Sequence, residues 1–321
     1  MKQHITRAYN SFQIDSARGV LSKKSKEERL SNEINYYKNL DSNSSIYFPR
    51  LLDSRLDGQD YIMDLEYYAY DNLGDYMVYN EFDSDFWENV VGSLNSMLFQ
   101  FSKTSKDGDY DNYARAMYID KTEKYYNDLV NSFDKFNKIS KHNTITFNGI
   151  KYLNFEYIWD DVKKLIEDKL LPLNKMQVIH GDCCFSNILC GFNKKTDTYI
   201  LKCIDPRGKF GELGIYGDTL YDSAKLLHSY EGGYEYIIFD KFQLSENDDL
   251  NDFNVNFYNN NKNKIKTIFD ANADFDLNKS RLIEGLIYIG MCSRHYDSEN
   301  RQTVMYNQGI KFLNEVLNNE L

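Results

Sequence analysis

Proline, paired cysteine motifs and long apolar segments are scarce or missing in this sequence. Only three prolines occur in 321 residues. No run approaches the roughly 18 to 20 consecutive apolar residues of a membrane-spanning helix. The opening segment MKQHITRAYN also lacks the apolar core of a secretory signal peptide. We therefore expect a cytoplasmic protein without a membrane span.

The cysteines argue against two kinds of cross-linked site. Their number is odd and none belongs to a CxxC pair, so neither a zinc ribbon nor a disulfide framework is indicated. We expect buried, reduced thiols at Cys183, Cys184, Cys190, Cys203 and Cys292.

An excess of cationic residues is also missing. The chain has 38 Lys and Arg against 49 Asp and Glu, for a formal net charge of -11. Because sequence-independent binding to nucleic acid needs cations that neutralise phosphates, this balance disfavours nucleic acid as a partner. The hydrophobic content of 42% is enough for a sizeable core, so a globular protein is expected.

The pattern of apolar residues predicts an α+β protein with two unequal lobes. In the first lobe, Leu30, Ile34 and Tyr37 recur at helical spacing and predict an amphipathic helix over residues 26–40. Short strands are predicted at residues 4–14, 19–24, 46–52 and 60–66. The character of the sequence changes after residue 66. We therefore expect a small β-rich lobe at 1–66 and a larger, mainly helical lobe at 67–321.

Helical patterns dominate the larger lobe. The spacing of Phe86, Val90 and Leu94 predicts a core helix, and Asp218 is expected to cap another. The polar, Asn-rich stretch 245–264 is predicted to be a long loop. Further predicted elements are helices at residues 120–137 and 157–170, a strand at 177–179, and a hairpin at 187–190 and 199–204.

The residues that suggest chemistry lie in HGDCCFSN at 180–187 and IDPRG at 204–208. Asn187 follows Asp182 by five positions, and Asp205 follows after a further eighteen. This is the spacing of the catalytic loops of phosphoryl-transfer enzymes. Asp182 can orient and deprotonate an attacking hydroxyl. Asn187 and Asp205 supply the oxygen ligands that Mg²⁺ prefers.

The segments HGDCCFSNIL, IDPRG and GDTLYDSAKL resemble the aminoglycoside phosphotransferase and choline kinase family, whose members share the protein-kinase-like fold. Gly181 occupies the position where protein kinases usually have arginine, which favours a small-molecule kinase. The resemblance implies that Asp182 is the catalytic residue and that His180 orients its loop. It also implies that Asn187 and Asp205 bind the metal.

The resemblance further implies a nucleotide site in the first lobe. A lysine on a strand should clamp the phosphates and pair with a glutamate on the next helix, which fits Lys23 or Lys24 with Glu33. Because side chains alternate in direction along a strand, only one of the two lysines can face the cleft, and Lys23 is preferred. Glu66 and Tyr67 resemble the hinge whose backbone groups receive a purine edge.

The sequence departs from the family pattern at two points. No G-x-G-x-x-G precedes the candidate lysine, and residues 9–12 have YNSF instead. Arg207 lies where many kinases have Phe-Gly after the metal-binding aspartate. It either enters the cleft to bind a phosphate or a substrate anion, or forms a structural ion pair with Glu212 or Asp218.

Candidates for the acceptor site come from two other segments. The cluster CSRHYD follows an apolar helix and resembles segments of kinase-like proteins associated with bacterial surface-polysaccharide genes. His295 and the nearby Arg301 are its candidates, with a solvated helix end as the alternative. Tyr118, Lys121 and Thr122 are further candidates.

The expected activity is transfer of the γ-phosphoryl group of ATP, with Mg²⁺, to a hydroxyl of a sugar, an amino alcohol or a surface-glycan precursor. Two alternatives are a nucleotide-binding pseudokinase and a protein kinase. The three filled catalytic-loop positions disfavour the first. Gly181 and the absence of an Ala-Pro-Glu segment after Asp205 disfavour the second. The acceptor, the choice between ATP and GTP, and the oligomeric state stay open.

Overall fold

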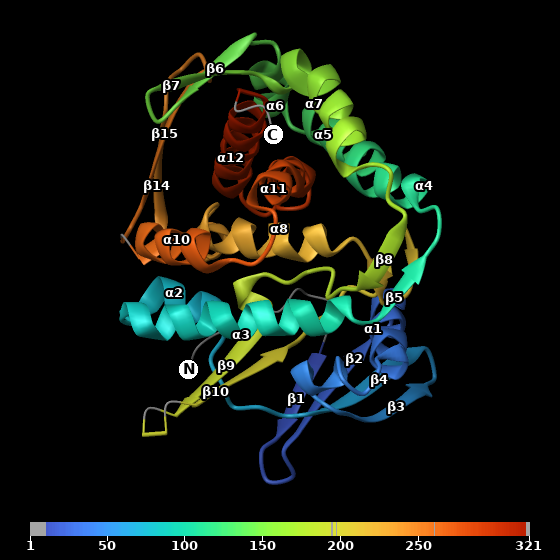
Figure 1. The fold of residues 1–321 in the computed structure, drawn as a ribbon. Helices are drawn as coiled ribbons and strands as arrows, with labels where there is room; N and C mark the ends of the chain where they lie inside the picture. The colour runs from blue at the N-terminus through green and yellow to red at the C-terminus, as the bar shows by residue number, and fades with distance from the viewer. Residues whose placement is uncertain (1–10, 194, 197, 260, 319–321) are drawn as a thin grey trace.

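The smaller lobe is a four-stranded antiparallel sheet with one helix, seen at the bottom of Figure 1. The computed structural model describes residues 11–193, 195–196, 198–259 and 261–318. The sheet has the order β1-β2-β4-β3, with strands β1 (Ser11–Asp15), β2 (Val20–Ser25), β3 (Leu51–Asp57) and β4 (Asp60–Glu66). Helix α1 (Glu28–Asn39) packs on it through a buried face that includes Leu30, Ile34 and Tyr37.

Most of the predicted elements of this lobe are present. The strands predicted at 19–24 and 60–66 and the helix predicted at 26–40 are confirmed within one or two residues. Residues 4–10 of the first predicted strand lie outside the described residues.

The prediction of a strand at residues 46–52 is largely wrong. Ser45–Tyr47 form a turn of 3₁₀ helix, and β3 begins only at Leu51. The Asp41 carboxylate accepts hydrogen bonds from the backbone N–H groups of Asn43 and Ser44. This local bonding turns the chain back and competes with extended structure.

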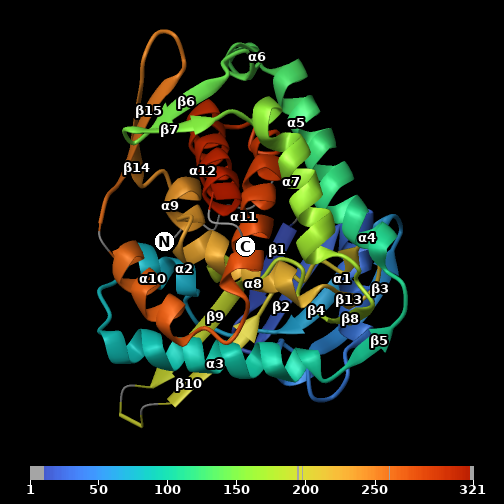
Figure 2. The ribbon, with the colours of Figure 1, turned by 45° about the horizontal axis from the view of Figure 1, so that its top comes forward.

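Helices form most of the larger lobe (Figures 1 and 2). They are α2 (Leu73–Tyr79), α3 (Ser84–Ser102), α4 (Asp111–Arg115), α5 (Lys121–Ser132), α6 (Asp134–Ser140), α7 (Phe155–Leu170), α8 (Thr219–Tyr230), α9 (Tyr234–Ile238), α10 (Asn261–Asn272), α11 (Leu277–Cys292) and α12 (Glu299–Asn318). Helix α11 is buried along nearly its whole length because α5, α8 and α12 pack around it. A helix that is buried on all sides forms the core of this lobe.

Small sheets connect these helices. Strands β5 (Ser105–Asp107), β8 (Lys175–Val178) and β13 (Tyr216–Gly217) form one sheet, and β9 (Ile188–Asn193) pairs with β10 (Thr198–Cys203). The strand predicted at 177–179 and the predicted hairpin correspond to β8, β9 and β10. The remaining strands are β6 (Thr144–Phe147), β7 (Ile150–Leu153), β11 (Lys209–Phe210), β12 (Glu212–Leu213), β14 (Phe242–Glu246) and β15 (Asp252–Phe257).

The loop predicted at residues 245–264 is a further error. Strands β14 and β15 pair antiparallel across this stretch, and α10 begins at Asn261. Along β15, Phe253 and Val255 are buried whereas Asn254 is exposed. This alternation is the pattern of a strand with one buried face, and the many asparagines obscured it.

The helix predicted at residues 120–137 is broken in two. Its chain leaves the helical conformation at Phe133, between α5 and α6. The other helix predictions agree with the structure, since α7 starts at Phe155 and α3 buries its predicted apolar face. The Asp218 carboxylate caps α8 by accepting from the Leu220 N–H at 3.0 Å.

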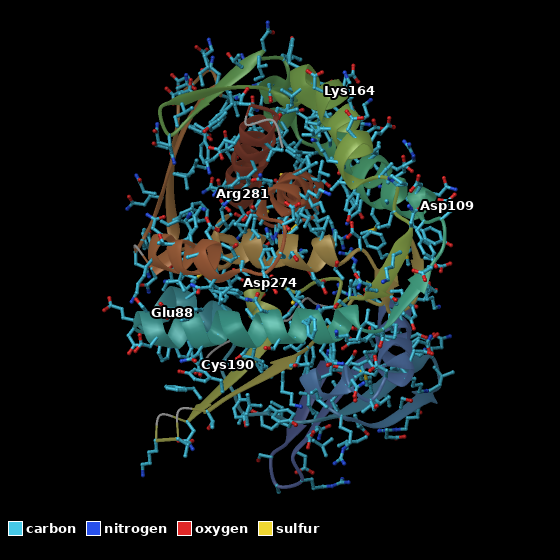
Figure 3. The ribbon with its side chains drawn as sticks, viewed as in Figure 1. Glu88, Asp109, Lys164, Cys190, Asp274 and Arg281 are labelled. Atoms are coloured by element: carbon cyan, nitrogen blue, oxygen red, sulfur yellow. The ribbon has the colours of Figure 1, made fainter. Side chains whose placement is uncertain are left out.

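Charged side chains such as Glu88, Asp109 and Lys164 lie on the outside of the molecule (Figure 3). All five cysteines are buried free thiols, as the sequence indicates. Within the described residues, no helix combines the length and the apolar character needed to cross a bilayer.

Candidate active site

The loop at residues 180–187 is held in place by hydrogen bonds to helix α8. The Asp222 carboxylate on this helix accepts hydrogen bonds from the backbone N–H groups of His180 at 2.6 Å and Gly181 at 2.8 Å. Asp222 is buried, so these bonds replace the water that the carboxylate loses on folding. Asp222 therefore fixes the backbone that carries Asp182.

His180 joins this loop to the segment that contains Asp205. Its Nε2 lies 2.9 Å from the Ile204 carbonyl, and its Nδ1 accepts from the Asp182 N–H at 3.2 Å. The ring stacks on Phe48 with centroids 5.8 Å apart. Burial lowers the pKa of His180 to about 4, so the imidazole is neutral near pH 7. A neutral ring with Nε2–H satisfies both bonds and serves as a structural link.

The three residues predicted to form the centre are brought together. The Asn187 side-chain amide donates to the Asp182 carbonyl at 2.8 Å, and the Asn187 carbonyl accepts from the Ile204 N–H at 2.9 Å. Asp205 follows Ile204 directly and has a positive φ of 59°. That left-handed conformation is uncommon for a residue other than glycine, and such strain is often found at functional sites.

Lys23 connects the two lobes at this centre. Its ammonium donates to the Glu33 carboxylate at 2.6 Å and forms an ion pair with Asp205. Burial would lower the pKa of Lys23, but Asp205 and Glu33 raise it above its ordinary value, so the ammonium stays charged. Lys24 points to the other face of β2, where it pairs with Asp60 at 3.0 Å. The alternative that Lys24 faces the cleft is therefore wrong.

A buried lysine that the sequence analysis missed contacts Asp182. The Lys225 ammonium on α8 lies 2.9 Å from an Asp182 carboxylate oxygen. Burial alone would raise the pKa of Asp182, but Lys225 and Arg207 lower it below its ordinary value. Lys225 lies one helical turn after Tyr221 and Asp222. That spacing was the available signal.

The predicted hinge offers fewer donors than expected. Glu66 and Tyr67 lie at the end of β4 and just beyond it. Their backbone N–H groups already donate to the carbonyls of Arg50 at 2.9 Å and Gly19 at 2.8 Å. These two N–H groups are engaged within the small lobe, and contact between the backbone of this segment and a purine stays a prediction.

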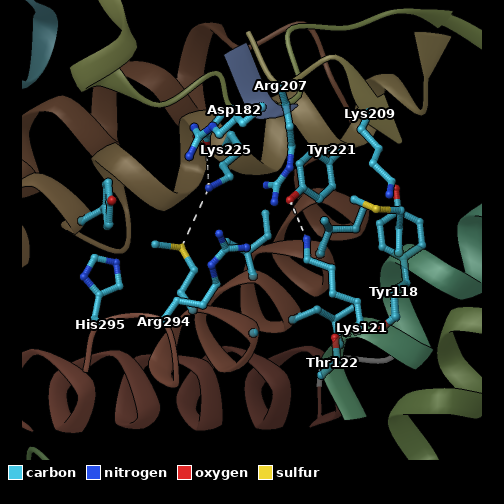
Figure 4. Close-up of a pocket in the computed structure, with 18 of the residues that line it drawn as sticks. Tyr118, Lys121, Thr122, Asp182, Arg207, Lys209, Tyr221, Lys225, Arg294 and His295 are labelled. Carbon is cyan, nitrogen blue, oxygen red and sulfur yellow. Dashed lines mark hydrogen bonds and ion pairs between the residues drawn. The ribbon is translucent and has the colours of Figure 1, made fainter. Parts of the chain in front are cut away.

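A cavity of about 230 Å³ opens beside Asp182, between the two lobes. Five of the predicted acceptor-site residues line it, as Figure 4 shows in close-up: Tyr118, Lys121, Thr122, Arg207 and His295.

Arg301, the sixth predicted acceptor-site residue, is absent from this lining. Its guanidinium binds Asp240 at 2.6 Å and Asp297 at 3.0 Å. Its placement in the acceptor site is therefore wrong. Sequence proximity to His295 was misleading, because Arg301 lies on the next helix, α12, where Asp240 and Asp297 hold its guanidinium.

Gly181 makes room for Arg207. Gly181 has φ of +77°, and a Cβ atom there would lie 2.9 Å from the Arg207 Cβ. A larger residue would displace Arg207 from the cavity wall. Within the described part of the chain, Arg207 forms neither of the ion pairs considered for it. Glu212 instead accepts from the Tyr113 hydroxyl and Asp218 from the Tyr118 hydroxyl.

Known proteins resemble this chain in fold. No protein-family model and no curated protein matches the sequence. Among solved structures, the apo form of a thermostable mutant of aminoglycoside phosphotransferase APH(4)-Ia matches with a TM-score of 0.55 at 10% identity. The match covers 95% of this chain and 89% of that chain. The chain has the protein-kinase-like fold.

Other aminoglycoside phosphotransferases share this protein-kinase-like fold with the chain. The GDP complex of a mutant 2'-phosphotransferase-IIIa gives a TM-score of 0.55 at 11% identity, over 98% of this chain and 90% of that one. A ternary complex of an APH(4)-Ia mutant with AMP-PNP and hygromycin B gives 0.54 at 12% identity, over 99% and 93%. These neighbours thus agree with this chain in fold.

The chemistry of Asn187 and Asp205 fits Mg²⁺. Burial would raise the pKa of Asp205, but Lys23 lowers it, so the carboxylate is ionised. Asn187 uses its amide N–H₂ on the Asp182 carbonyl, which leaves its amide oxygen for a cation. Groups of three or more His, Cys, Asp or Glu side chains that could hold a metal are absent from the described residues. Mg²⁺ commonly completes such a two-residue site with phosphate oxygens and water.

Proposed function

We propose that the protein is an ATP- and Mg²⁺-dependent kinase that phosphorylates a hydroxyl of a small molecule, such as a sugar, an amino alcohol or a surface-glycan precursor. The observation that carries this proposal is the connection of Asp182, Asn187 and Asp205, with Asp182 in the wall of a cavity. Lys23 adds a buried cation at the same place. Each of these groups has a role in phosphoryl transfer.

Each residue would contribute through position and charge. Asp182 accepts a hydrogen bond from the acceptor hydroxyl and aligns its oxygen with the γ-phosphorus. The oxygen–phosphorus bond forms as the bond to the ADP oxygen breaks, and the hydroxyl proton leaves through Asp182 to water. Because the pKa of Asp182 is lowered, orientation of the nucleophile is its main contribution.

Mg²⁺ would supply positive charge beside the β- and γ-phosphates when bound to Asn187 and Asp205. Lys23, held by Glu33, would contact the same phosphates from the small lobe. The neighbours with AMP-PNP and with GDP show that this fold accepts either purine. We propose ATP as the donor, and competition with GTP tests that choice.

Two substitutions separate these roles. Asp182→Asn should lower kcat by about 10² to 10⁴, the usual size of such a contribution, while AMP-PNP binding stays nearly unchanged. Asp205→Asn should weaken both turnover and Mg²⁺-dependent nucleotide binding. Glu88→Gln on the exposed face of α3 is the control. The measurements are ADP release with a panel of acceptors and calorimetric titration with AMP-PNP and Mg²⁺.

The outcomes separate the candidate functions. Full turnover by the Asp182→Asn protein would contradict the assigned catalytic residue. Nucleotide binding without any stimulated ADP release would favour the pseudokinase alternative. Transfer of labelled phosphate to a protein mixture, with none to small acceptors, would favour a protein kinase.

A further inference from the structure

The cavity beside Asp182 is strongly cationic. Asp182 is the only carboxylate among the described residues that line it. The cationic lining residues are Arg29, Lys121, Arg207, Lys209, Lys225 and Arg294. This local charge is opposite in sign to the net charge of the whole chain, -11. The clustered cations give the cavity a positive potential although the protein as a whole is acidic.

Several of these cations have no carboxylate partner. Lys225 is paired with Asp182, whereas no ion pair within the described residues involves Lys121, Arg207 or Arg294. Their neighbours are phenols. Lys121 donates to the Tyr221 hydroxyl at 3.2 Å, and Arg294 donates to the Tyr125 hydroxyl at 3.3 Å. Phenol oxygens satisfy single donors but do not balance the charge.

The three unpaired cations come from separate elements and converge. Lys121 begins α5, Arg207 follows β10, and Arg294 follows α11. In Figure 4 their side chains extend from different sides toward the middle of the cavity, close to Tyr221. Elements that are distant in sequence therefore place positive charge around one small volume.

The cations of the cavity shift the pKa values of neighbouring side chains. Burial lowers the pKa of Lys121, and the nearby Arg207 and Lys225 lower it further. Burial alone would raise the pKa of Tyr221, but Lys121, Arg207 and Lys225 lower it to about 8. The positive charge in the cavity thus stabilises the ionised form of Tyr221 relative to that of an ordinary tyrosine. Lys121 and Arg207 are partly buried without a carboxylate partner, which is costly, and an anionic ligand would relieve that cost.

The residues proposed to bind the nucleotide are not among those that line this cavity. In the proposed function, Lys23, Asn187 and Asp205 bind the nucleotide phosphates and their cation. Lys121 and Arg294 belong instead to the helical wall of the large lobe. That wall also has an apolar part that suits the carbon skeleton of a small molecule, formed by Ile283, Leu286 and Ile287.

We propose that the acceptor is an anion: a small hydroxyl compound that carries a phosphate or carboxylate group bound by Lys121, Arg207 and Arg294. This inference rests on the proposed kinase activity and names its substrate class. A polycationic acceptor such as an aminoglycoside would meet several like charges and a single carboxylate that Lys225 already neutralises. Guanidinium groups suit such oxyanions because they donate two parallel hydrogen bonds.

The first experiment compares four acceptors with the wild-type protein. Glucose, glucose 6-phosphate, glucuronate and kanamycin are supplied with ATP and Mg²⁺, and ADP release is measured. We expect kcat/KM to be at least about tenfold higher for one of the two anionic compounds than for glucose, because a charge-assisted contact is gained. The two anionic arms distinguish a phosphate from a carboxylate. Equal or better turnover of glucose or kanamycin would overturn the inference while supporting the kinase proposal.

The second experiment measures binding without turnover. The protein loaded with AMP-PNP and Mg²⁺ is titrated with inorganic phosphate, glucose 6-phosphate and glucuronate in a calorimeter. Lys121→Met should weaken the binding of the anion at least about tenfold and leave the affinity for AMP-PNP unchanged. The control is Lys124→Met, one turn along the same helix, where the exposed lysine pairs with Asp128 at 2.6 Å.

The binding results are decisive even if none of the four acceptors is phosphorylated. Anion binding that Lys121→Met weakens and Lys124→Met preserves supports the inference. No anion binding, or binding that is insensitive to Lys121→Met, overturns it. Failure to bind AMP-PNP at all would instead contradict the proposed function, so the two failures are distinguishable.

Discussion

At the residue scale, Glu235 is a buried carboxyl group behind the catalytic loop. One of its oxygens accepts from the Ser186 N–H at 3.0 Å and from the Ser229 hydroxyl at 2.9 Å. The other oxygen, Oε2, has no hydrogen-bond partner among the described residues. Burial raises the pKa of Glu235 to about 7. The native protein therefore holds a proton that the unfolded chain releases near pH 4.5.

This raised pKa predicts a pH-dependent loss of stability. Between about pH 4.5 and pH 7 the folded state binds the proton and the unfolded state does not, so the contribution of Glu235 to stability falls as the pH rises. The full loss is on the order of 3 kcal/mol, since one pKa unit corresponds to about 1.4 kcal/mol. Glu235→Gln keeps an oxygen for both bonds and carries no ionisable proton.

We therefore expect Glu235→Gln to be more stable than the wild type at pH 8, with a much smaller difference at pH 4.5. Urea unfolding at the two pH values measures it. Glu88→Gln on the surface is the control and should change little at either pH. A stability difference for Glu235→Gln that does not increase with pH would contradict the assigned titration.

At the element scale, the catalytic loop depends on a glycine that both turns and leaves space. Gly181 has φ of +77°, and a Cβ atom added there would lie only 2.9 Å from the Arg207 Cβ. Gly19, in the turn between β1 and β2, also has a positive φ of +65° but has nothing within 4 Å of an added Cβ. The two positions thus share a left-handed backbone conformation, which strains any residue with a side chain, and they differ in packing.

Gly181→Ala should lower kcat by about 10², because even a displacement of about 1 Å in the loop misaligns Asp182 and Arg207. Gly19→Ala should lower the free energy of unfolding by about 1 kcal/mol through the same kind of backbone strain as Gly181→Ala. It should leave kcat nearly unchanged. Steady-state kinetics and urea unfolding of both proteins separate the effects. Equal kcat values for the two variants would show that the contact with Arg207 is irrelevant to catalysis.

Elements with regular apolar spacing were predictable from the sequence, and elements whose pairing is distant were not. Helix α3 follows from Phe86, Val90 and Leu94, which recur on one face and are all buried. Strand β15 did not stand out, because its short alternation lies among asparagines and its parallel partner β6 is about a hundred residues earlier. The end of α5 at Phe133 was not predictable, because no residue there signals a helix end.

At the scale of the whole molecule, the two lobes meet at several contacts around the centre. The Tyr36 hydroxyl on α1 donates to the Ile179 carbonyl at 2.9 Å, and Lys202 donates to the Ile46 carbonyl at 2.6 Å. The ion pair between Lys23 and Asp205 is a third contact between the lobes. These contacts hold the small lobe against the large lobe near residues 179–205.

The proposed catalytic centre was more predictable than the cavity beside it for a geometric reason. Asp182, Asn187 and Asp205 lie within one short stretch, so their spacing carries the signal. The cavity collects Lys121, Arg294 and others from helices that approach only in the folded chain. Lys225 was missed for the same reason, since its contact with Asp182 depends on how α8 packs against the loop at residues 180–187.

The central claim is that this cavity receives a small hydroxyl compound and that the γ-phosphoryl group of ATP is transferred to it. The most direct measurement is ³¹P NMR of the protein with ATP, Mg²⁺ and each acceptor in turn. We predict that the γ-phosphate signal declines and a new phosphate-ester signal grows with an anionic acceptor, and that Asp182→Asn prevents both changes. Growth of inorganic phosphate alone, or a new ester signal that persists in Asp182→Asn, would contradict the account.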